Sequence, residues 1–140
     1  ADELSEPLRG QAAESGLIMR PPGRTPNTLY SLEATEYAQQ HGKFLEFHHA
    51  AYKAFWDDRQ DIGTVEVLEN IANSVDLDGA DMLQSLEAQT YSETVMGQYQ
   101  EALKYGISGI PTFLVGNLMF TGAHPYDIFK LAMERYLTEE

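Results

Sequence analysis

Residues 105–125, YGISGIPTFLVGNLMFTGAHP, decide the fold because here the hydrophobic pattern changes from a helical period to a strand period. Two apolar, β-prone runs, TFLV and LMFT, are separated by Gly116-Asn117, a dipeptide typical of a two-residue hairpin turn. Counting outward from the turn gives the pairs Val115 with Leu118, Leu114 with Met119, Phe113 with Phe120 and Thr112 with Thr121. Because both runs are apolar at consecutive positions, we expect both faces of the hairpin to be covered, as in a layered α/β domain.

The chain before the hairpin is predicted to be mainly helical. A short amphipathic helix at residues 2–15 precedes an extended segment at 16–19 and a proline-rich connection at 20–27, which cannot continue a helix. Five helices then follow, the first capped by Asn27 and the fourth by Asp78. The fifth is expected to bury a stripe that consists of Val95, Met96, Tyr99, Ala102 and Leu103.

Two further apolar sets are predicted to be buried. After the hairpin, Pro125 fits the first turn of a terminal helix whose apolar stripe can pack on one face of the hairpin. That stripe consists of Ile128, Phe129, Ala132, Met133 and Tyr136. In the second helix, the aromatic residues Phe44, Phe47, Tyr52, Phe55 and Trp56 are interpreted as core of the helical layer.

Length and composition describe an ordinary globular chain. Its 140 residues suffice for one domain without disulfide or metal staples, and no apolar run approaches the ~18 residues of a membrane span, so we expect a soluble protein. The net charge of −13 disfavours nucleic acid and anionic membrane surfaces as partners. The sequence contains no cysteine, so it forms neither an internal disulfide nor a thiolate metal site.

Pro111 stands at the head of the first strand of the hairpin. A proline cannot donate to a strand ladder, so it belongs at a strand start or in a cis turn, and an isolated Gly-x-Pro favours the plain strand start. Here the surroundings add information. A helix ending at Gly106, then ISGIPTFLV, a two-residue turn, LMFTGAHP and a terminal helix resemble the C-terminal half of thioredoxin-fold proteins of the DsbA type.

The resemblance extends upstream over most of the chain, from about residue 16 to 137. The segments NTLYSLEATEYAQQHG and AYKAFWDDRQDIGTVEVLENIANSVDLD are similar to the FrnE-like branch of dithiol-disulfide isomerases. The resemblance implies an α/β, thioredoxin-like fold in one domain, residues 1–140. In this domain a large helical insertion occupies residues 16–106, and the thioredoxin hairpin and terminal helix occupy residues 107–140. In that family the helical subdomain overhangs the active site, so part of the aromatic set is also a candidate for a substrate groove.

The same resemblance implies which residues bind substrate. The peptide bond between Ile110 and Pro111 is expected to be cis, and the loop formed by Gly109, Ile110, Pro111 and Thr112 is expected to face a C-x-x-C pair and to bind a protein or small thiol or disulfide substrate. The sequence itself supplies no catalytic residue, and no cofactor or metal is expected. The branch also suggests a cytoplasmic protein.

The departure from the family pattern is as informative as the match. Family members begin with a strand, a helix that carries C-x-x-C and a second strand, and none of these is present in the sequence. We therefore expect the chain to be the C-terminal part of a disulfide oxidoreductase or isomerase, inactive alone because exchange needs a thiolate. The hairpin edge left without a partner predicts a homo-oligomer, or association with the missing N-terminal segment.

Two alternatives remain open at this point, and a metal site is disfavoured. A glutathione-binding relative of kappa-class transferases and hydroxychromene-carboxylate isomerases shares the helical insertion and the Gly-x-Pro-Thr-Phe loop, although TGAHP suits that branch less well. A non-catalytic module that uses the loop to pair with peptide main chain needs no cysteine. Glu46 and His49 form E-x-x-H, but a di-metal bundle site requires a second such motif, which the sequence lacks.

Overall fold

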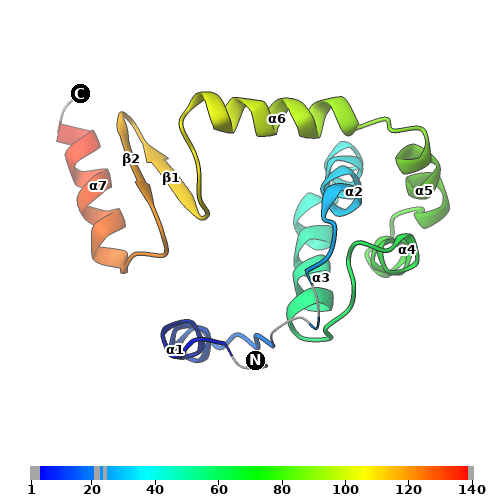
Figure 1. The fold of residues 1–140 in the computed structure, drawn as a ribbon, viewed down its shortest axis with the longest axis horizontal. Helices are drawn as coiled ribbons and strands as arrows, with labels where there is room; N and C mark the ends of the chain where they lie inside the picture. The colour runs from blue at the N-terminus through cyan, green and yellow to red at the C-terminus, as the bar shows by residue number, and fades with distance from the viewer. Residues whose placement is uncertain (1–3, 21–22, 24, 139–140) are drawn as a thin grey trace. The chain divides into compact units, whose positions relative to one another are not determined.

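The computed structural model describes residues 4–20, 23 and 25–138. Within these residues the chain forms seven α-helices and one two-stranded sheet (Figure 1). Their bounds are α1 Glu6–Glu14, α2 Leu29–Gln40, α3 Phe44–Trp56, α4 Val65–Ser74, α5 Gly79–Glu87, α6 Ser92–Lys104, β1 Thr112–Val115, β2 Leu118–Thr121 and α7 Tyr126–Thr138. Residues 2 and 3 of the first predicted helix, and Pro21, Pro22 and Arg24 of the predicted connection, lie outside the described residues. The chain divides into two compact units, Ala1–Met96 and Gly97–Glu140, so the boundary falls within α6.

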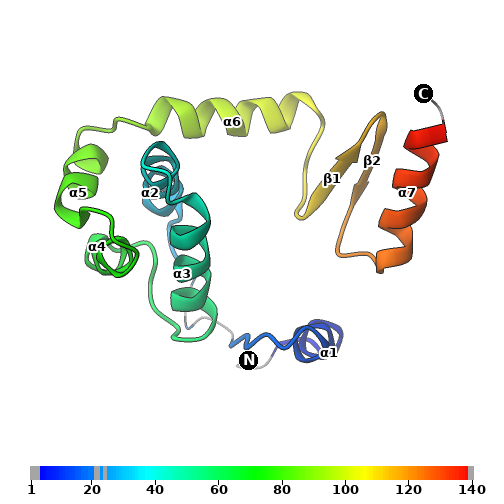
Figure 2. The ribbon, with the colours of Figure 1, turned by 180° about the vertical axis from the view of Figure 1, so that it is seen from behind.

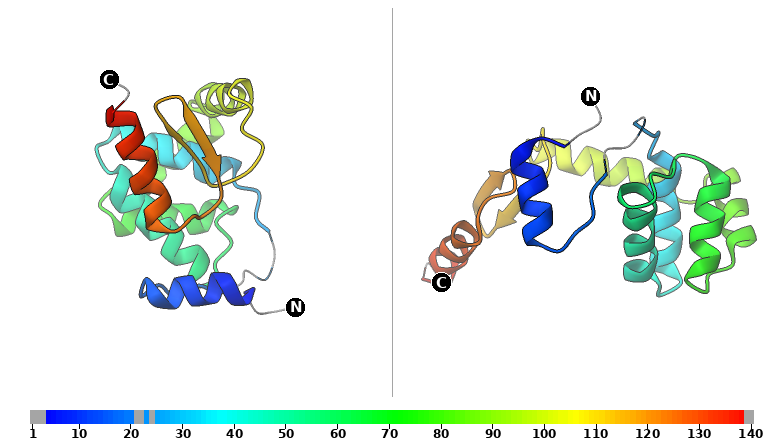
Figure 3. Two further views of the ribbon diagram at one scale, coloured as in Figure 1. Left: turned by 90° about the vertical axis from the view of Figure 1, so that its left-hand side faces the viewer. Right: turned by 90° about the horizontal axis from the view of Figure 1, so that it is seen from below.

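The first unit is built around a core shared by α2, α3, α4 and α5, which lie side by side in the right-hand view of Figure 3. Its largest fully buried apolar side chains are Phe47, Leu68 and Met82. The small buried apolar residues of α2 and α3 belong to the same core, namely Ala34, Ala38, Ala51 and Ala54. Because alanine has the smallest apolar side chain, it allows two helix backbones to approach closely while apolar residues from α4 and α5 complete the core.

Polar contacts fix how the helices of this unit begin and meet. Asp78 caps α5 as predicted, because its Oδ1 accepts a hydrogen bond of 3.0 Å from the backbone N–H of Asp81. The Tyr37 hydroxyl donates to Asp81 Oδ2 at 2.8 Å and so ties α2 to α5. Burial, together with the Asp81 carboxylate, raises the pKa of Tyr37 above its usual range, so the phenol keeps the proton that it donates.

The predicted start of α2 is wrong by one residue. Thr28, not Asn27, occupies the N-cap position, and it makes no side-chain capping bond. Asn27 still supports the first turn, since its Oδ1 accepts a hydrogen bond of 3.1 Å from the backbone N–H of Leu29. The asparagine therefore stabilises the chain entering the helix rather than the cap itself.

Glu33 is a carboxyl group inside the core of the helical unit. It lies on α2 with only 1% of its surface exposed, and its Oε1 accepts a hydrogen bond of 2.7 Å from the Ser92 hydroxyl. Its Oε2 has no hydrogen-bond partner among the described residues. Ser92 is the first residue of α6, where the helix carries partial positive charge, so the acidic side chain is placed where it is favoured.

Replacing Ser92 by alanine is expected to lower the free energy of unfolding by about 1–3 kcal/mol, because the buried Glu33 loses its hydroxyl donor. Urea unfolding followed by circular dichroism measures this loss. Ser85→Ala is the matched control, since the Ser85 hydroxyl donates only to the Met82 carbonyl oxygen within its own helix. Equal losses in the two variants would show that the Ser92 hydroxyl does nothing special for Glu33.

The second unit contains the hairpin and α7, which lie together in Figure 2. The antiparallel register is confirmed in full: Thr112 pairs with Thr121, Phe113 with Phe120, Leu114 with Met119, and Val115 with Leu118. Three aromatic rings join the hairpin to the helix. The ring centroid of Phe129 lies 4.7 Å from that of Phe113 and 5.2 Å from that of Phe120, and both contacts are edge to face. The Phe113 and Phe120 rings stack on each other with their centroids 5.5 Å apart.

The expectation that both faces of the hairpin are covered is wrong for the described chain. The face of Phe113 and Phe120 packs on α7, whereas Leu114 and Met119 on the opposite face are 56% and 43% exposed. One helix can cover only one side of a two-stranded sheet. The terminal stripe is likewise only partly buried. Ala132 is buried and Phe129 half-buried, while Ile128, Met133 and Tyr136 are exposed.

The predicted buried stripe of α6 is also wrong for most of its members. Val95 is buried, but Met96, Tyr99 and Leu103 are exposed within the described chain. Helical spacing shows which side chains share a face, yet burial requires a neighbouring element over that face.

None of the described helices combines the length and the apolar character needed to cross a lipid bilayer.

Candidate functional site

The loop that contains Pro111 connects the end of α6 to β1. The helix stops at Gly106, whose φ of +75° lies in the left-handed region that favours glycine. The next backbone N–H, that of Ile107, donates back to the Ala102 carbonyl oxygen at 3.0 Å. This closes the helix and directs the chain into the segment 108–111.

Three hydrogen-bonding contacts fix the loop, and two of them join it to Thr121 and Gly122 at the end of β2. The Pro111 carbonyl oxygen accepts from the Gly122 N–H at 2.8 Å. The Thr112 hydroxyl donates to the Gly109 carbonyl oxygen at 2.7 Å and lies 3.0 Å from the Thr121 hydroxyl. The peptide bond between Ile110 and Pro111 is cis. The four predicted site residues, 109–112, therefore form one turn supported by the hairpin.

His124 belongs to the same support, although the sequence favours only capping or exposure for a histidine near a helix end. Its Nε2 lies 3.0 Å from the Thr121 carbonyl oxygen, to which the tautomer protonated at Nε2 donates. Its ring also meets Phe120 edge to face at 5.7 Å. The available signal was its position two residues after Gly122, in the short turn that follows β2.

The loop presents unpaired main-chain groups. The Ile110 side chain is 92% exposed, and its backbone makes no hydrogen bond within the described part of the chain. Pro111 has no N–H to donate. Because the sheet contains only β1 and β2 among the described residues, the outer edge of β1 is unpaired as well. A loop and a strand edge of this kind can pair with an extended peptide through main-chain hydrogen bonds.

These groups can bind, but they cannot exchange disulfides. The sequence has no cysteine, and disulfide exchange requires a sulfur nucleophile. Across residues 4–20, 23 and 25–138, no group of three or more His, Asp or Glu side chains is arranged to hold a metal ion. Glu46 of the E-x-x-H motif lies 4.0 Å from the Lys43 amine instead.

The interpretation of the α3 aromatic residues as core is correct for one member and wrong for others. Phe47 is fully buried, but Phe44 and Tyr52 are 38% and 57% exposed.

A second face of α3 lines a pocket together with residues 16–19. This face carries His48, Tyr52 and Trp56 at intervals of four residues. The spacing was visible in the sequence, whereas the contact with a segment about 30 residues earlier in the chain was not.

Comparison with known proteins gives the family. The model of the DSBA-like thioredoxin domain matches residues 1–134. The uncharacterized protein YwbO of Bacillus subtilis (strain 168) is 31% identical over an alignment of 113 residues, and the match covers 77% of this chain and 54% of YwbO. The chain therefore belongs to the DSBA-like thioredoxin domain family.

Two solved structures share the fold. One, assigned as a DsbA oxidoreductase of Streptomyces coelicolor, superposes with a TM-score of 0.85 at 25% identity, over 96% of this chain and 59% of that one. The other, assigned as a protein disulfide isomerase of Nitrosomonas europaea, has a TM-score of 0.73 at 16% identity, over 100% of this chain and 78% of that one. The chain thus spans between half and three fifths of the lengths of YwbO and the Streptomyces protein.

Proposed function

We propose that this chain supplies the substrate-binding part of a DsbA-type protein-disulfide oxidoreductase or isomerase. In this proposal, Gly109, Ile110, Pro111 and Thr112, continued by the open edge of β1, pair with an extended segment of substrate. The observation that carries it is the exposed, unpaired Ile110 held on a turn whose neighbours are all hydrogen-bonded to the hairpin. Membership of the family supports the same assignment.

The geometry suits binding because the loop is ordered before a partner arrives. Thr112 bonds to Gly109 within the turn and contacts Thr121 across the hairpin, and Gly122 fixes the Pro111 carbonyl group. A site whose main chain is already ordered loses less conformational entropy on binding. Pairing through the main chain also tolerates many substrate sequences, as an oxidoreductase acting on different proteins requires.

The sulfur chemistry must come from outside these 140 residues. Exchange begins when a thiolate attacks one sulfur of a disulfide and displaces the other as a thiolate, and methionine cannot replace that nucleophile. We propose a dithiol of the C-x-x-C type, carried on other residues of the whole protein, that meets the substrate held at this loop. The FrnE-like branch remains our preferred assignment within the family.

Peptide binding tests this function. Insulin B chain with carboxamidomethylated cysteines is unfolded and thiol-free, and we expect it to shift the amide NMR signals of residues 109–115. Thr112→Val should weaken binding about fivefold, since it removes hydrogen bonding worth about 1 kcal/mol from the turn. Thr138→Val is the control, because the Thr138 hydroxyl only donates to the Arg135 carbonyl oxygen on α7.

Other results would change the assignment. Shifts confined to residues outside the loop, or equal affinity in both variants, would contradict it. If glutathione shifts the loop signals more strongly than the peptide does, the glutathione-binding branch is the better assignment.

The chain should also leave the reduction of insulin by dithiothreitol at its uncatalysed rate, because it has no thiol.

A further inference from the structure

A second concave site lies within the helical unit and involves none of the loop residues. It is a pocket of about 730 Å³ between one face of α3 and the segment 16–19. Two hydrogen bonds hold that segment on the end of the helix. The backbone N–H of Arg20 donates to the Trp56 carbonyl oxygen at 2.9 Å, and its guanidinium donates to the Asp57 carbonyl oxygen at 2.9 Å.

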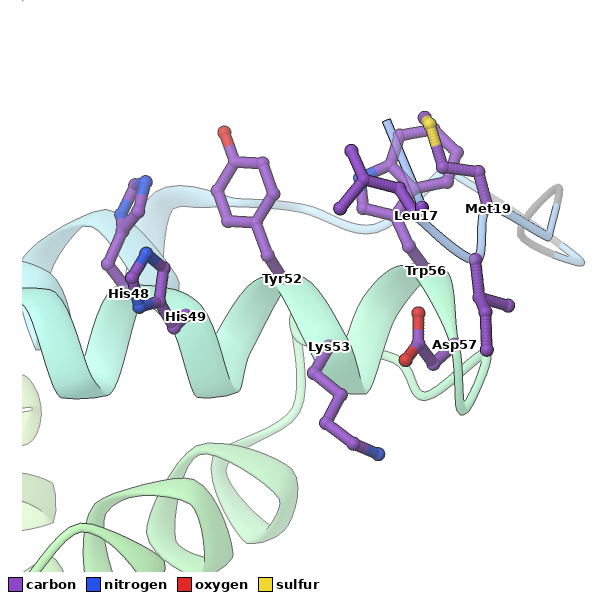
Figure 4. Close-up of a pocket in the computed structure, with 10 residues that line it drawn as sticks. Leu17, Met19, His48, His49, Tyr52, Lys53, Trp56 and Asp57 are labelled. Atoms are coloured by element: carbon purple, nitrogen blue, oxygen red, sulfur yellow. The ribbon is translucent and has the colours of Figure 1, made fainter. Parts of the chain in front are cut away.

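The pocket is elongated and has two chemically different ends. Figure 4 shows His48 and His49 at one end, Tyr52 in the middle, and Trp56 beside Leu17 and Met19 at the other. Eight residues of helix separate His48 from Trp56, which corresponds to about 12 Å at 1.5 Å per residue. At the histidine end the row is closely packed, since the centroids of the His48 and Tyr52 rings lie 4.6 Å apart. An aromatic molecule of two rings matches this length.

The polar groups at the histidine end are available for hydrogen bonding. The imidazoles of His48 and His49 and the Tyr52 hydroxyl make no hydrogen bond in the part of the chain that the structure describes. Leu17, in the apolar wall of the pocket, is 60% exposed, and Tyr52, next to the histidine end, is 57% exposed. Both parts of the pocket are therefore open to a ligand. A ligand that offers one hydroxyl or carbonyl group there satisfies these groups without displacing a protein contact.

Lys53 and Asp57 are the charged side chains that line the pocket among the described residues. Lys53 points away from the rings in Figure 4 and donates to Asp58 at 3.1 Å, so its charge is already paired. The Asp57 side chain lies at the end of the pocket opposite His48 and His49 in Figure 4, and Arg20 donates to its backbone carbonyl oxygen, not to its carboxylate. A charged head group at the histidine end would lose hydration and find no unpaired countercharge there.

We propose that this pocket binds an uncharged aromatic molecule with one hydrogen-bonding head group. Its rings lie between Tyr52, Trp56, Leu17 and Met19, where edge and offset contacts with aromatic rings and with the methionine sulfur are favourable. The head group lies at His48 and His49. Pockets of this volume, mostly apolar and with a few convergent polar groups, are typical of small-molecule sites.

The single tryptophan of the sequence gives a specific readout. With 4-phenylphenol as the probe, the indole N–H signal of Trp56 in the NMR spectrum of the full chain should shift and saturate. Biphenyl-4-carboxylate and 4-phenylbenzylammonium carry the same rings with a charge of either sign. Each should bind at least about tenfold more weakly than the phenol, because burying a charge without a partner is costly.

Matched variants decide whether the pocket is responsible. Leu17→Ala should weaken 4-phenylphenol binding about tenfold, whereas Leu45→Ala on the same helical unit should leave it unchanged. The two variants are well matched because Leu17 and Leu45 are almost equally exposed, at 60% and 61%, and only Leu17 lines the pocket. Tyr52→Leu, at another exposed position, provides a second test with an expected loss of similar size.

Three results would overturn the proposal. They are an unmoved Trp56 signal, an equal loss in Leu45→Ala, and a charged analogue that binds as tightly as the phenol. Melting curves of the variants should match that of the parent chain, since Leu17, Leu45 and Tyr52 are all exposed. The peptide test is read from different signals, those of residues 109–115, so either site can fail without the other.

Discussion

Replacing Phe47 by alanine is expected to remove about 3–5 kcal/mol from the free energy of unfolding of the helical unit. Phe47 is fully buried and belongs to the core formed with Leu68 and Met82. Alanine leaves a cavity where the ring was, because helices already packed through alanines cannot move closer to fill it. Small domains are stable by only about 5–15 kcal/mol, so this loss is a large fraction of the total stability.

Urea unfolding followed by Trp56 fluorescence measures this effect, since Trp56 lies on the same helix and is the only tryptophan in the sequence. Phe44→Ala is the matched control. It removes the same ring from the first turn of α3, where the side chain is 38% exposed, and should cost about 1 kcal/mol or less. Comparable losses in the two variants would mean that the core is not centred on Phe47.

Local sequence signals predicted the features that depend on few neighbours. The hairpin register follows from a two-residue turn at Gly116-Asn117 and a side-chain period of two, so all four pairs were predicted correctly. The cap at Asp78 depends only on a backbone N–H three residues later. Both predictions use contacts within a few residues of the chain, where the sequence alone limits the geometry.

Burial was harder to predict because it depends on distant parts of the molecule. Met96, Tyr99 and Leu103 have ideal helical spacing, and Leu114 has a β-prone neighbourhood, yet each is exposed in the described chain. An apolar pattern identifies the side chains that gain by being covered, but not the element that covers them. The missed start of α2 has a different, local cause, because Asn27 and Thr28 are adjacent and both are residue types that favour a helix N-cap.

The two candidate sites differ in how visible they were. The loop at residues 109–112 was predicted because glycine, proline and threonine restrict the backbone locally and because the pattern resembles a known family. The pocket was not predicted, since it depends on a backbone hydrogen bond between Arg20 and Trp56 at the end of α3, 36 residues further along. Main-chain contacts of that kind have no residue signature.

Replacing Gly116 by alanine is expected to cost the hairpin unit about 2–5 kcal/mol. Two effects add up. Gly116 has a φ of +60°, which disfavours an L side chain by about 1–2 kcal/mol. A Cβ atom there would also contact the Tyr136 ring of α7, coming within 2.8 Å of Cε2 and overlapping Cδ2, and such overpacking costs about 1–3 kcal/mol.

Hydrogen exchange of the Phe113 and Phe120 amides measures the loss, which should speed exchange by a factor of about 30 or more. A double-mutant cycle with Tyr136→Ala separates the causes, because that change removes the ring and leaves the backbone strain. If the hairpin packs on α7 as described, Gly116→Ala should cost only about 1–2 kcal/mol in the Tyr136→Ala background. Gly10→Ala is the control for an added methyl group, since nothing lies within 4 Å of its Cβ position and it sits inside α1. A cost of Gly116→Ala that Tyr136→Ala does not reduce would mean that the turn and the helix are not in contact, and the aromatic cluster would then have to hold the hairpin alone.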